Sequence, residues 1–453
     1  MKTMHRHSGE LNAASHLAMP GIQVGSRRWF LKTGAAAMAS LPLATLQQIQ
    51  AQATTGSSKK SVILFWLSGG PSQIDMWDPK PDAPVEIRSP FDTISTSVPG
   101  IQFTEHLPKQ AAIADKIAVL RAVDCSASNH TPITMQAGNP LARRTNDGKD
   151  GGGYPSMGSV VAKFRGANDP SMPAFVGLAD SWVSDVYGAG HMGSKFEPVK
   201  GLELADKFKL PQGLNIERLQ NRVALREQIN TARRQLENNQ RLDQFDANTQ
   251  RAVDMVLSGK VEQAFDVSQE SDQLRDKYGR VSVGEKAILA RRLVEAGVSF
   301  VLVSGAWGYF DHHGDNVRWG GIEKGLKPLL PRVDQVYAAL VEDLDQRGML
   351  DDTLVMMMGE FGRSPKINTE AGRDHWVPVM SMIMSGGGIA GGQVIGSTDR
   401  TGGEIKSGKV RPQDLAATTF KHLGIKLDSH WTDPQGRPIP IVQEGGHLIP
   451  GLL

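Results

Sequence analysis

Carboxylate and imidazole side chains stand close together in the stretch Tyr309-Phe-Asp-His-His-Gly-Asp-Asn316, and this combination can bind a divalent metal ion. Asp311 and His313 are two positions apart in a glycine-containing loop, so both side chains project to the same side and could ligate one ion or two neighbouring ions. Imidazole nitrogen with carboxylate oxygen favours zinc or manganese, whereas all-oxygen sites favour calcium or magnesium. A turn in which Asp caps a helix and His covers the core is the alternative.

A second group of such residues lies in the stretch 358–376, after an apolar run. Glu360 is predicted to ligate a metal or, alternatively, to pair with Arg363. The Arg363 guanidinium could instead hold an oxyanion of the substrate, because its planar fork matches phosphate and sulfate. His375 is expected to close the same site from a returning loop, with Asp374 orienting the imidazole. A structural His at the start of a strand is the alternative.

A third group, Ser126-Ala-Ser-Asn-His-Thr-Pro132, precedes an expected helix. Ser128 or Thr131 could attack an ester from the helix N-terminus, where free N–H groups and the helix dipole favour anions. His130 is expected to be a metal ligand or a general acid. Capping of the helix by the polar side chains is the alternative. Asp75, which follows the first apolar run of the chain, is a further candidate metal ligand.

Apolar runs of strand length alternate with helical stretches, and these elements must position the polar groups. The runs are 61–67, 116–123, 299–304, 353–358 and 379–385, and the helical stretches are about 105–114, 155–165, 285–295, 326–346 and 413–422. Continuous apolar strands between helices predict a mainly parallel α/β sheet with helices on both faces. Ligands bind beyond the carboxyl ends of such strands, so we expect the groups to meet at one edge.

The composition is that of a globular protein, with 40% hydrophobic residues, 22% charged residues and 49 glycines in 453 residues. One α/β domain is expected over residues 54–453. Its segment 213–280 is polar, with apolar residues at helical spacing, and is predicted to be a helical insertion. The lone Cys125 excludes an intrachain disulfide, so the core or a metal must stabilise the fold.

The stretch Ser26-Arg-Arg-Trp-Phe-Leu-Lys32 resembles a twin-arginine export signal, and the apolar segment after it is too short to span a membrane. We expect a signal peptide over residues 1–53, contact with the twin-arginine export machinery, a periplasmic or extracellular location, and no permanent membrane anchor. Loss of this peptide removes five of 50 basic and one of 48 acidic residues, leaving 45 against 47. With no basic run interleaved with aromatics, nucleic acid is not expected as a partner.

Four motifs together carry a resemblance to a known family: TLVMMMGEFGRSP, GRDHW, FDHHGDN, and SNH before a helix. Over about residues 61–450 the chain resembles the domain of unknown function 1501 family. That family is placed in the alkaline phosphatase-like superfamily, with sulfatases and phosphatases. The resemblance implies a mainly parallel sheet between helices, metal ligands at strand ends and a nucleophile at a helix start.

Carried over residue by residue, Asp311 and His313 resemble the Asp and His of one metal site, and Glu360 the acid that follows a central strand. His375 resembles the late His that closes the site. The chain departs from the superfamily at Leu67-Ser-Gly-Gly70, where a metal-binding Asp is usual, so Asp75 or Asp78 would have to substitute. Cys125-Ser-Ala-Ser-Asn129 lacks the arginine of the sulfatase motif, so formylglycine is not expected.

The resulting hypothesis is an exported metal-dependent hydrolase of phosphate or sulfate esters. It would use one or two divalent ions, zinc or manganese in preference to calcium or magnesium. Its expected partner is an anionic ester, with a polysaccharide as one candidate carrier. The alternative is a catalytically inactive exported protein of the same fold that binds polysaccharide or another surface partner.

Overall fold

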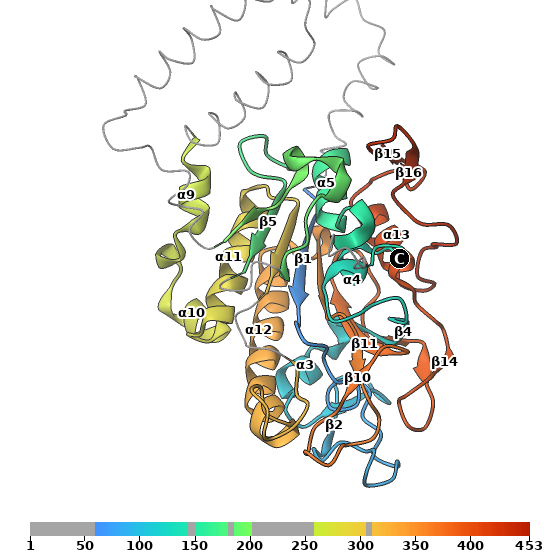
Figure 1. The fold of residues 1–453 in the computed structure, drawn as a ribbon. Helices are drawn as coiled ribbons and strands as arrows, with labels where there is room; N and C mark the ends of the chain where they lie inside the picture. The colour runs from blue at the N-terminus through green and yellow to red at the C-terminus, as the bar shows by residue number, and fades with distance from the viewer. Residues whose placement is uncertain (1–58, 144–149, 180–184, 202–257, 305–309) are drawn as a thin grey trace, which may run out of the picture. The chain divides into compact units, whose positions relative to one another are not determined.

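The centre of the structure, a computed structural model, is a sheet of eight strands (Figure 1). The structure describes residues 59–143, 150–179, 185–201, 258–304 and 310–453. The strand order is β12-β4-β11-β8-β1-β7-β5-β6. The strands are β1 (Ser61–Trp66), β4 (Ile117–Val123), β5 (Phe175–Leu178), β6 (Val199–Lys200), β7 (Phe300–Val303), β8 (Thr353–Met358), β11 (Met380–Ser385) and β12 (Gln393–Ile395).

Strand directions confirm the predicted mainly parallel sheet, with one exception. β1 runs parallel to β7 and β8, and β5, β6 and β12 are each parallel to a neighbour. β11 runs antiparallel to both β4 and β8. Consequently the chain that enters β11 lies at the same edge as the chain that leaves β1, β4, β7 and β8. A loop before a strand can therefore join loops that follow strands in one site.

Helices cover both faces of the sheet, as predicted. The five predicted helices are α3 (Pro108–Ala112), α5 (Met157–Phe164), α11 (Ser282–Ala296), α12 (Lys327–Gln346) and α13 (Pro412–His422). The others described are α4 (Ile133–Ala137), α9 (Lys260–Phe265) and α10 (Asp272–Tyr278). α9 and α10 lie in the predicted insertion; its residues 213–257, and the predicted signal peptide 1–53, lie outside the described residues.

Short strands pair in twos beside the main sheet. They are β2 (Thr93–Ser95) with β3 (Gln102–Thr104), β9 (Gly362–Arg363) with β10 (His375–Trp376), β13 (Ser397–Thr398) with β14 (Ile405–Ser407), and β15 (His430–Thr432) with β16 (Pro438–Pro440). The β9–β10 pair sets Arg363 opposite His375. Among the described residues, no helix combines the length and the apolar character that crossing a membrane requires.

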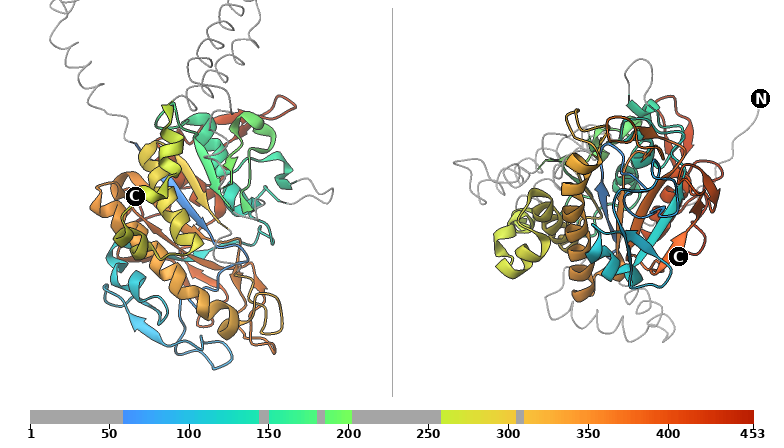
Figure 2. Two further views of the ribbon diagram at one scale, coloured as in Figure 1. Left: turned by 90° about the vertical axis from the view of Figure 1, so that its left-hand side faces the viewer. Right: turned by 90° about the horizontal axis from the view of Figure 1, so that it is seen from below.

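Side-chain alternation along β1 divides the core into two layers. Ile63 and Phe65 pack with residues of α11 and α12 on one face, which the left view of Figure 2 brings toward the reader. Leu64 and Trp66 pack with residues of α5 and α13 on the other face (Figure 1). Both faces of β1 are therefore buried, and this explains why its sequence is a continuous apolar run.

Asp334, a buried carboxylate of α12, caps the short helix α3 from outside. It accepts hydrogen bonds from the backbone N–H groups of Lys109 and Gln110, at 2.9 and 2.7 Å. These N–H groups belong to the first turn of α3, where no partner exists within the helix. Burial raises the pKa of Asp334 to about 6, because the carboxylate is taken out of water without a cationic partner.

We expect Asp334 to make stability depend on pH. Its folded-state pKa of about 6 exceeds the usual 3.8, so between these values the folded protein binds the proton that the unfolded chain has lost. This contribution to the free energy of unfolding is therefore full below pH ~4 and is lost as the pH rises through 6. Between pH 4 and 7 the wild type should lose on the order of 2–3 kcal/mol relative to Asp334→Asn, which does not titrate.

Urea unfolding of both proteins across this pH range measures the difference. The control is Asp351→Asn, because Asp351 is exposed. Its difference from the wild type should change by less than about 0.5 kcal/mol over the same range. Parallel pH profiles for the wild type and Asp334→Asn would contradict the assignment.

Candidate metal centre

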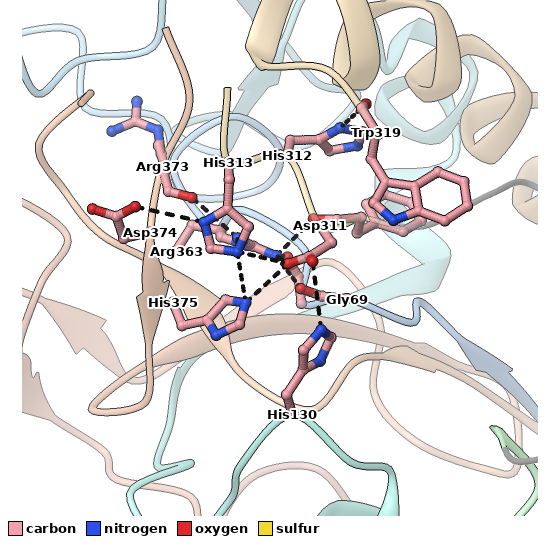
Figure 3. Close-up of polar contacts among 12 residues, drawn as sticks. Gly69, His130, Asp311, His312, His313, Trp319, Arg363, Arg373, Asp374 and His375 are labelled. Atoms are coloured by element: carbon pink, nitrogen blue, oxygen red, sulfur yellow. Dashed lines mark hydrogen bonds and ion pairs between the residues drawn. The ribbon is translucent and has the colours of Figure 1, made fainter. Parts of the chain in front are cut away.

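Three loops at one edge of the sheet bring imidazole and carboxylate groups together. His130 follows β4, Asp311 follows β7, and His375 begins β10 before the chain enters β11. One ligand atom from each of these residues lies within 4.8 Å of the other two. Figure 3 shows their side chains pointing toward one another from different parts of the chain. The antiparallel direction of β11 is what places His375 at this edge.

Asp311 is the centre of this group. Its Oδ1 lies 2.9 Å from His375 Nε2 and 3.0 Å from His313 Nε2, and these two nitrogens are 2.9 Å apart. Its Oδ2 lies 3.5 Å from His130 Nε2. Ligands bonded to one zinc ion at about 2.0–2.1 Å, at right or tetrahedral angles, are about 2.9–3.4 Å apart. The triangle formed by Asp311, His313 and His375 therefore has the size of a metal ligand set.

Glu360, at the end of β8, is buried beside this group. Its Oε1 accepts a hydrogen bond from the Gly69 N–H at 2.8 Å and lies 3.0 Å from His130 Nδ1. Its Oε2 has no hydrogen-bond partner among the described residues, although the residue is only 2% exposed. A buried carboxylate oxygen without a partner is costly. A cation bound beside Glu360 Oε2 would compensate this cost.

The carboxylates set the protonation of the imidazoles. Hydrogen bonds to Asp311 and Glu360 outweigh burial and raise the pKa of His130 to about 9. Burial acts to raise the pKa of Asp311, but its contacts with His130, His375 and Arg363 hold it well below its usual value. Burial, with the charge of Arg363, lowers the pKa of His375. His130 is thus the protonated imidazole of the group, and His375 is disposed to be neutral, as a metal ligand must be.

Arg363 lies beneath Asp311 and is 1% exposed. It donates to Asp311 Oδ1 at 2.6 Å and to the backbone carbonyls of Gly70, Phe310 and Arg373, each at 3.0 Å. Every guanidinium nitrogen is therefore engaged by the protein. The predicted substrate-binding role of Arg363 stays a prediction, and in the structure this arginine holds the loop that carries Asp311.

Asp75, a predicted metal ligand, lies apart from the group. Its carboxylate is fully buried and forms a two-point ion pair with Arg373, at 2.8 and 3.1 Å, and accepts a hydrogen bond from Ser72. Although burial opposes it, Arg373 holds the pKa of Asp75 below its usual value. Asp78, the other substitute, contacts Lys80 and Arg121. The predicted ligand role of Asp75 stays a prediction, and in the structure Arg373 neutralises its charge within the fold.

The two candidate hydroxyls occupy different surroundings. Ser128 is 8% exposed and donates to the Asn129 carbonyl at 3.4 Å, whereas Thr131 donates to Asn129 Oδ1 at 2.6 Å. A cavity of about 650 Å³ borders the site, and Thr131 lines it together with His130, Asp311 and Glu360. Ser128 is not among the lining residues. Thr131 is therefore the hydroxyl that a ligand in this cavity can reach.

The same cavity contains residues that the sequence did not single out. Lys200 of β6 and Arg318 bring positive charge to its wall, and Asp185 brings a further acid. Burial, reinforced by repulsion from Glu360, raises the pKa of Asp185. Asp185 follows β5 and so lies beyond the carboxyl end of a strand, as the predicted site residues do. However, β5 has only four residues and was not predicted. Arg318 stands five positions after His313, and this proximity was the available signal.

Comparison with known proteins gives distant structural likenesses. The PsFucS1 sulfatase from Pseudoalteromonas sp. is 13% identical over 84% of this chain and 70% of its own, with a TM-score of 0.40. The lipoteichoic acid synthase LtaP from Listeria monocytogenes is 11% identical over 87% and 76%, with a TM-score of 0.35. The phosphonate monoester hydrolase SpPMH from Silicibacter pomeroyi is 11% identical over 82% and 74%, with a TM-score of 0.34.

No curated protein sequence matches the chain. A family model does match it, over residues 59–453, which is the whole of the α/β unit. The motifs that carried the resemblance, from SNH to GRDHW, all lie within this range. The chain therefore belongs to the DUF1501 family, described as proteins of unknown function.

Proposed function

We propose that this protein is an exported, metal-dependent hydrolase of phosphate or sulfate esters. One observation carries the proposal: loops from separate strands bring donor atoms of His130, Asp311 and His375 within 4.8 Å of one another, and His130 and Asp311 also line a cavity of about 650 Å³. Partly exposed imidazoles that converge on one carboxylate are the chemistry of a zinc or manganese site. A polar pocket beside such a site is suited to a substrate.

Asp311, His313 and His375 would hold the ion, and Glu360 would support it through its unpartnered oxygen. When bound, a divalent ion supplies a Lewis acid for a phosphoryl or sulfuryl oxygen. Arg363 keeps Asp311 in place through a buried ion pair. Because Arg363 lies beneath the site, its role is to position the ligand and not to contact the ester.

The chain's own residues supply the remaining steps. An oxygen nucleophile, the Thr131 hydroxyl or a water molecule, would form a bond to phosphorus or sulfur as the ester bond breaks, and its proton would pass to solvent in the cavity. If Thr131 attacks, water would then hydrolyse the threonine ester in a second step and restore the hydroxyl. The leaving oxygen would take a proton from His130, whose imidazole lines the cavity and lies 3.0 Å from Glu360 Oε1 through Nδ1 and 3.5 Å from Asp311 Oδ2 through Nε2. Lys200 and Arg318 line the cavity and favour an anionic substrate.

The cellular setting is part of the proposal. Export through the twin-arginine pathway is supported by the stretch 26–32, and it would place the protein in the periplasm or outside the cell. One or two ions and an ester carried on a polysaccharide are consistent with a cavity that is open and charged. Folding before export would let the cell load the metal in the cytoplasm.

A second candidate is a non-catalytic protein of the same fold that binds a polysaccharide or another surface partner. A specific observation favours it: β1 is followed by Leu67-Ser-Gly-Gly70, which contains no acid, and Arg373 neutralises the charge of Asp75. A site that has lost a metal ligand can keep its fold and lose its chemistry.

The metal centre predicts a measurable loss of affinity when its imidazoles are removed. In isothermal titration of chelator-treated full-length protein with zinc or manganese, His313→Ala and His375→Ala should each weaken binding at least 10-fold, because each removes a nitrogen ligand. His430→Ala is the control, since His430 is exposed on β15. Metal affinities equal to that of the wild type in both variants would contradict the proposed metal centre.

The cavity predicts which hydroxyl matters for hydrolysis. With nitrophenyl phosphate and nitrophenyl sulfate, we expect the metal-loaded protein to hydrolyse at least one ester. Thr131→Ala should lower kcat about 100-fold or more if the hydroxyl attacks, and His130→Ala by about 100-fold through loss of the proton donor. Ser128→Ala, outside the cavity, is the matched control and should change kcat less than about 3-fold.

Two results would redirect the proposal. If Thr131→Ala keeps wild-type kcat while His130→Ala loses it, a water molecule is the nucleophile. If the metal-loaded wild type hydrolyses neither ester, the non-catalytic binding protein becomes the better account.

A further inference from the structure

We propose that a cavity separate from the metal centre binds an amphipathic anion, in which an acidic group is joined to an apolar hydrocarbon part. The cavity has a volume of about 760 Å³ and is lined by residues of α5, β5 and β6 and of the segments that precede these two strands (α5 and β5 in Figure 1). Among its described lining residues, none belongs to the metal centre. The inference concerns binding and does not depend on the proposed hydrolysis.

Three basic side chains at the cavity wall come from two separate elements. Lys163 and Arg165 lie at the C-terminal end of α5, and Lys195 lies in the short 3₁₀ helix η5 (Ser194–Phe196). In the described part of the chain, neither lysine forms an ion pair with an acid. The wall therefore carries positive charge that the protein itself does not neutralise.

Both lysines lie beside the ring of Phe196. Lys163 Nζ and Lys195 Nζ are each 5.7 Å from its centroid, and Lys163 Nζ is also 5.6 Å from the Phe164 centroid. The ring compensates the ammonium groups only in part, and burial lowers the pKa of Lys163, because the cation is partly taken out of water. Two like charges beside one ring also repel each other. A bound anionic group would offset both effects.

The position of Lys163 has a second explanation, which does not extend to Lys195. Lys163 lies in the last turn of α5, where a cation complements the helix dipole. Lys195 belongs to a 3₁₀ helix of three residues and gains little from such a dipole. Glu197 is the one acid among the described residues of the wall, and its Oε1 already accepts a hydrogen bond from the Ala189 N–H at 2.8 Å. An acid from outside the protein is therefore the missing partner.

The rest of the wall is mostly apolar, and this selects the kind of anion. Met172, Pro173 and Phe175 are buried residues that line the cavity, and Val199 of β6 lines it as well. An inorganic anion would leave this apolar surface in contact with water. A hydrocarbon part would cover it and gain free energy in proportion to the area removed from water. The wall thus fits an acid that carries an apolar group.

One segment of the chain separates this cavity from the cavity at the metal centre. Glu197 lines both cavities, and of the two residues of β6, Val199 lines the first and Lys200 the second. β6 is the last strand in the order of the sheet, so it has a strand neighbour on one side only. A ligand in the proposed site would therefore contact the wall of the candidate active site without touching its metal ligands.

Isothermal titration of the full-length protein with octanesulfonate tests the site. This probe has a charge and an alkyl chain but no ester bond, so the proposed hydrolase activity cannot consume it. We expect the wild type to bind one octanesulfonate per chain. Methanesulfonate, which has the charge without the chain, and octyl glucoside, which has the chain without the charge, should each bind at least about 10-fold more weakly.

Two variants remove the charges of the wall. Lys163→Met and Lys195→Met each keep an unbranched side chain, and each should weaken octanesulfonate binding about 5-fold or more, because a charged donor is lost. Lys421→Met is the matched control, since Lys421 is exposed in the last turn of α13, as Lys163 is in the last turn of α5. It removes the same charge from the same position of a helix and should leave affinity within about 2-fold of the wild type.

Three results would overturn the site. They are no binding of octanesulfonate, equal affinities for octanesulfonate and methanesulfonate, and wild-type affinity in a double lysine variant that circular dichroism shows to be folded. If the double variant does not fold, the single variants decide by the same criterion. Loss of binding in Arg318→Ala but not in the lysine variants would place the probe in the other cavity and would also overturn the site.

The outcome is independent of the proposed function. A protein that binds octanesulfonate through the two lysines but hydrolyses neither nitrophenyl ester would keep this site and lose the proposed hydrolase. A protein that hydrolyses an ester but does not bind octanesulfonate would keep the hydrolase and lose the site. The two proposals therefore fail on different measurements.

Discussion

The ion pair between the buried Arg363 and the partly buried Asp311 is the interaction on which the rest of the site depends. Arg363 belongs to β9, yet its guanidinium also binds carbonyls of the loops that follow β1 and β7. Those loops carry or support the acids of the site, and β10, paired with β9, carries His375. Removing one member of a buried pair typically costs about 3–5 kcal/mol, because the other charge is left unpaired. A single cation thus ties the separate loops to one geometry.

The direction of β11 completes this arrangement. A fully parallel sheet would have sent the chain before β11 to the opposite edge, away from the loops after β4, β7 and β8. Because β11 is antiparallel, residues 362–376 remain at the edge where Asp311 lies, and His375 approaches it from the chain that leads into β11. The position of His375 therefore follows from sheet topology as much as from its own loop.

Much of this could be predicted from sequence, and the part that could not has a physical reason. Continuous apolar runs predict strands that are buried on both faces. Because ligands bind beyond the carboxyl ends of such strands, the sequence also predicts that Asp311, His313, Glu360 and His375 lie at one edge, where the structure has them. Asp75 forms an ion pair with Arg373, which is 298 positions away in the sequence. The local spacing of residues cannot predict such a long-range pair. Asp185 follows a strand too short to give a periodic signal.

The charges at the wall of the cavity argue for an occupant. Asp185, Glu360 and Asp311 line it, Arg363 is buried beneath Asp311, and His130 contacts both Glu360 and Asp311. A phosphate or sulfate ester drawn in by Lys200 and Arg318 would meet these acids and be repelled at close range. Anion binding and this set of carboxylates are compatible only when additional positive charge lies between them. A metal ion at the imidazoles would supply that charge without changing the fold.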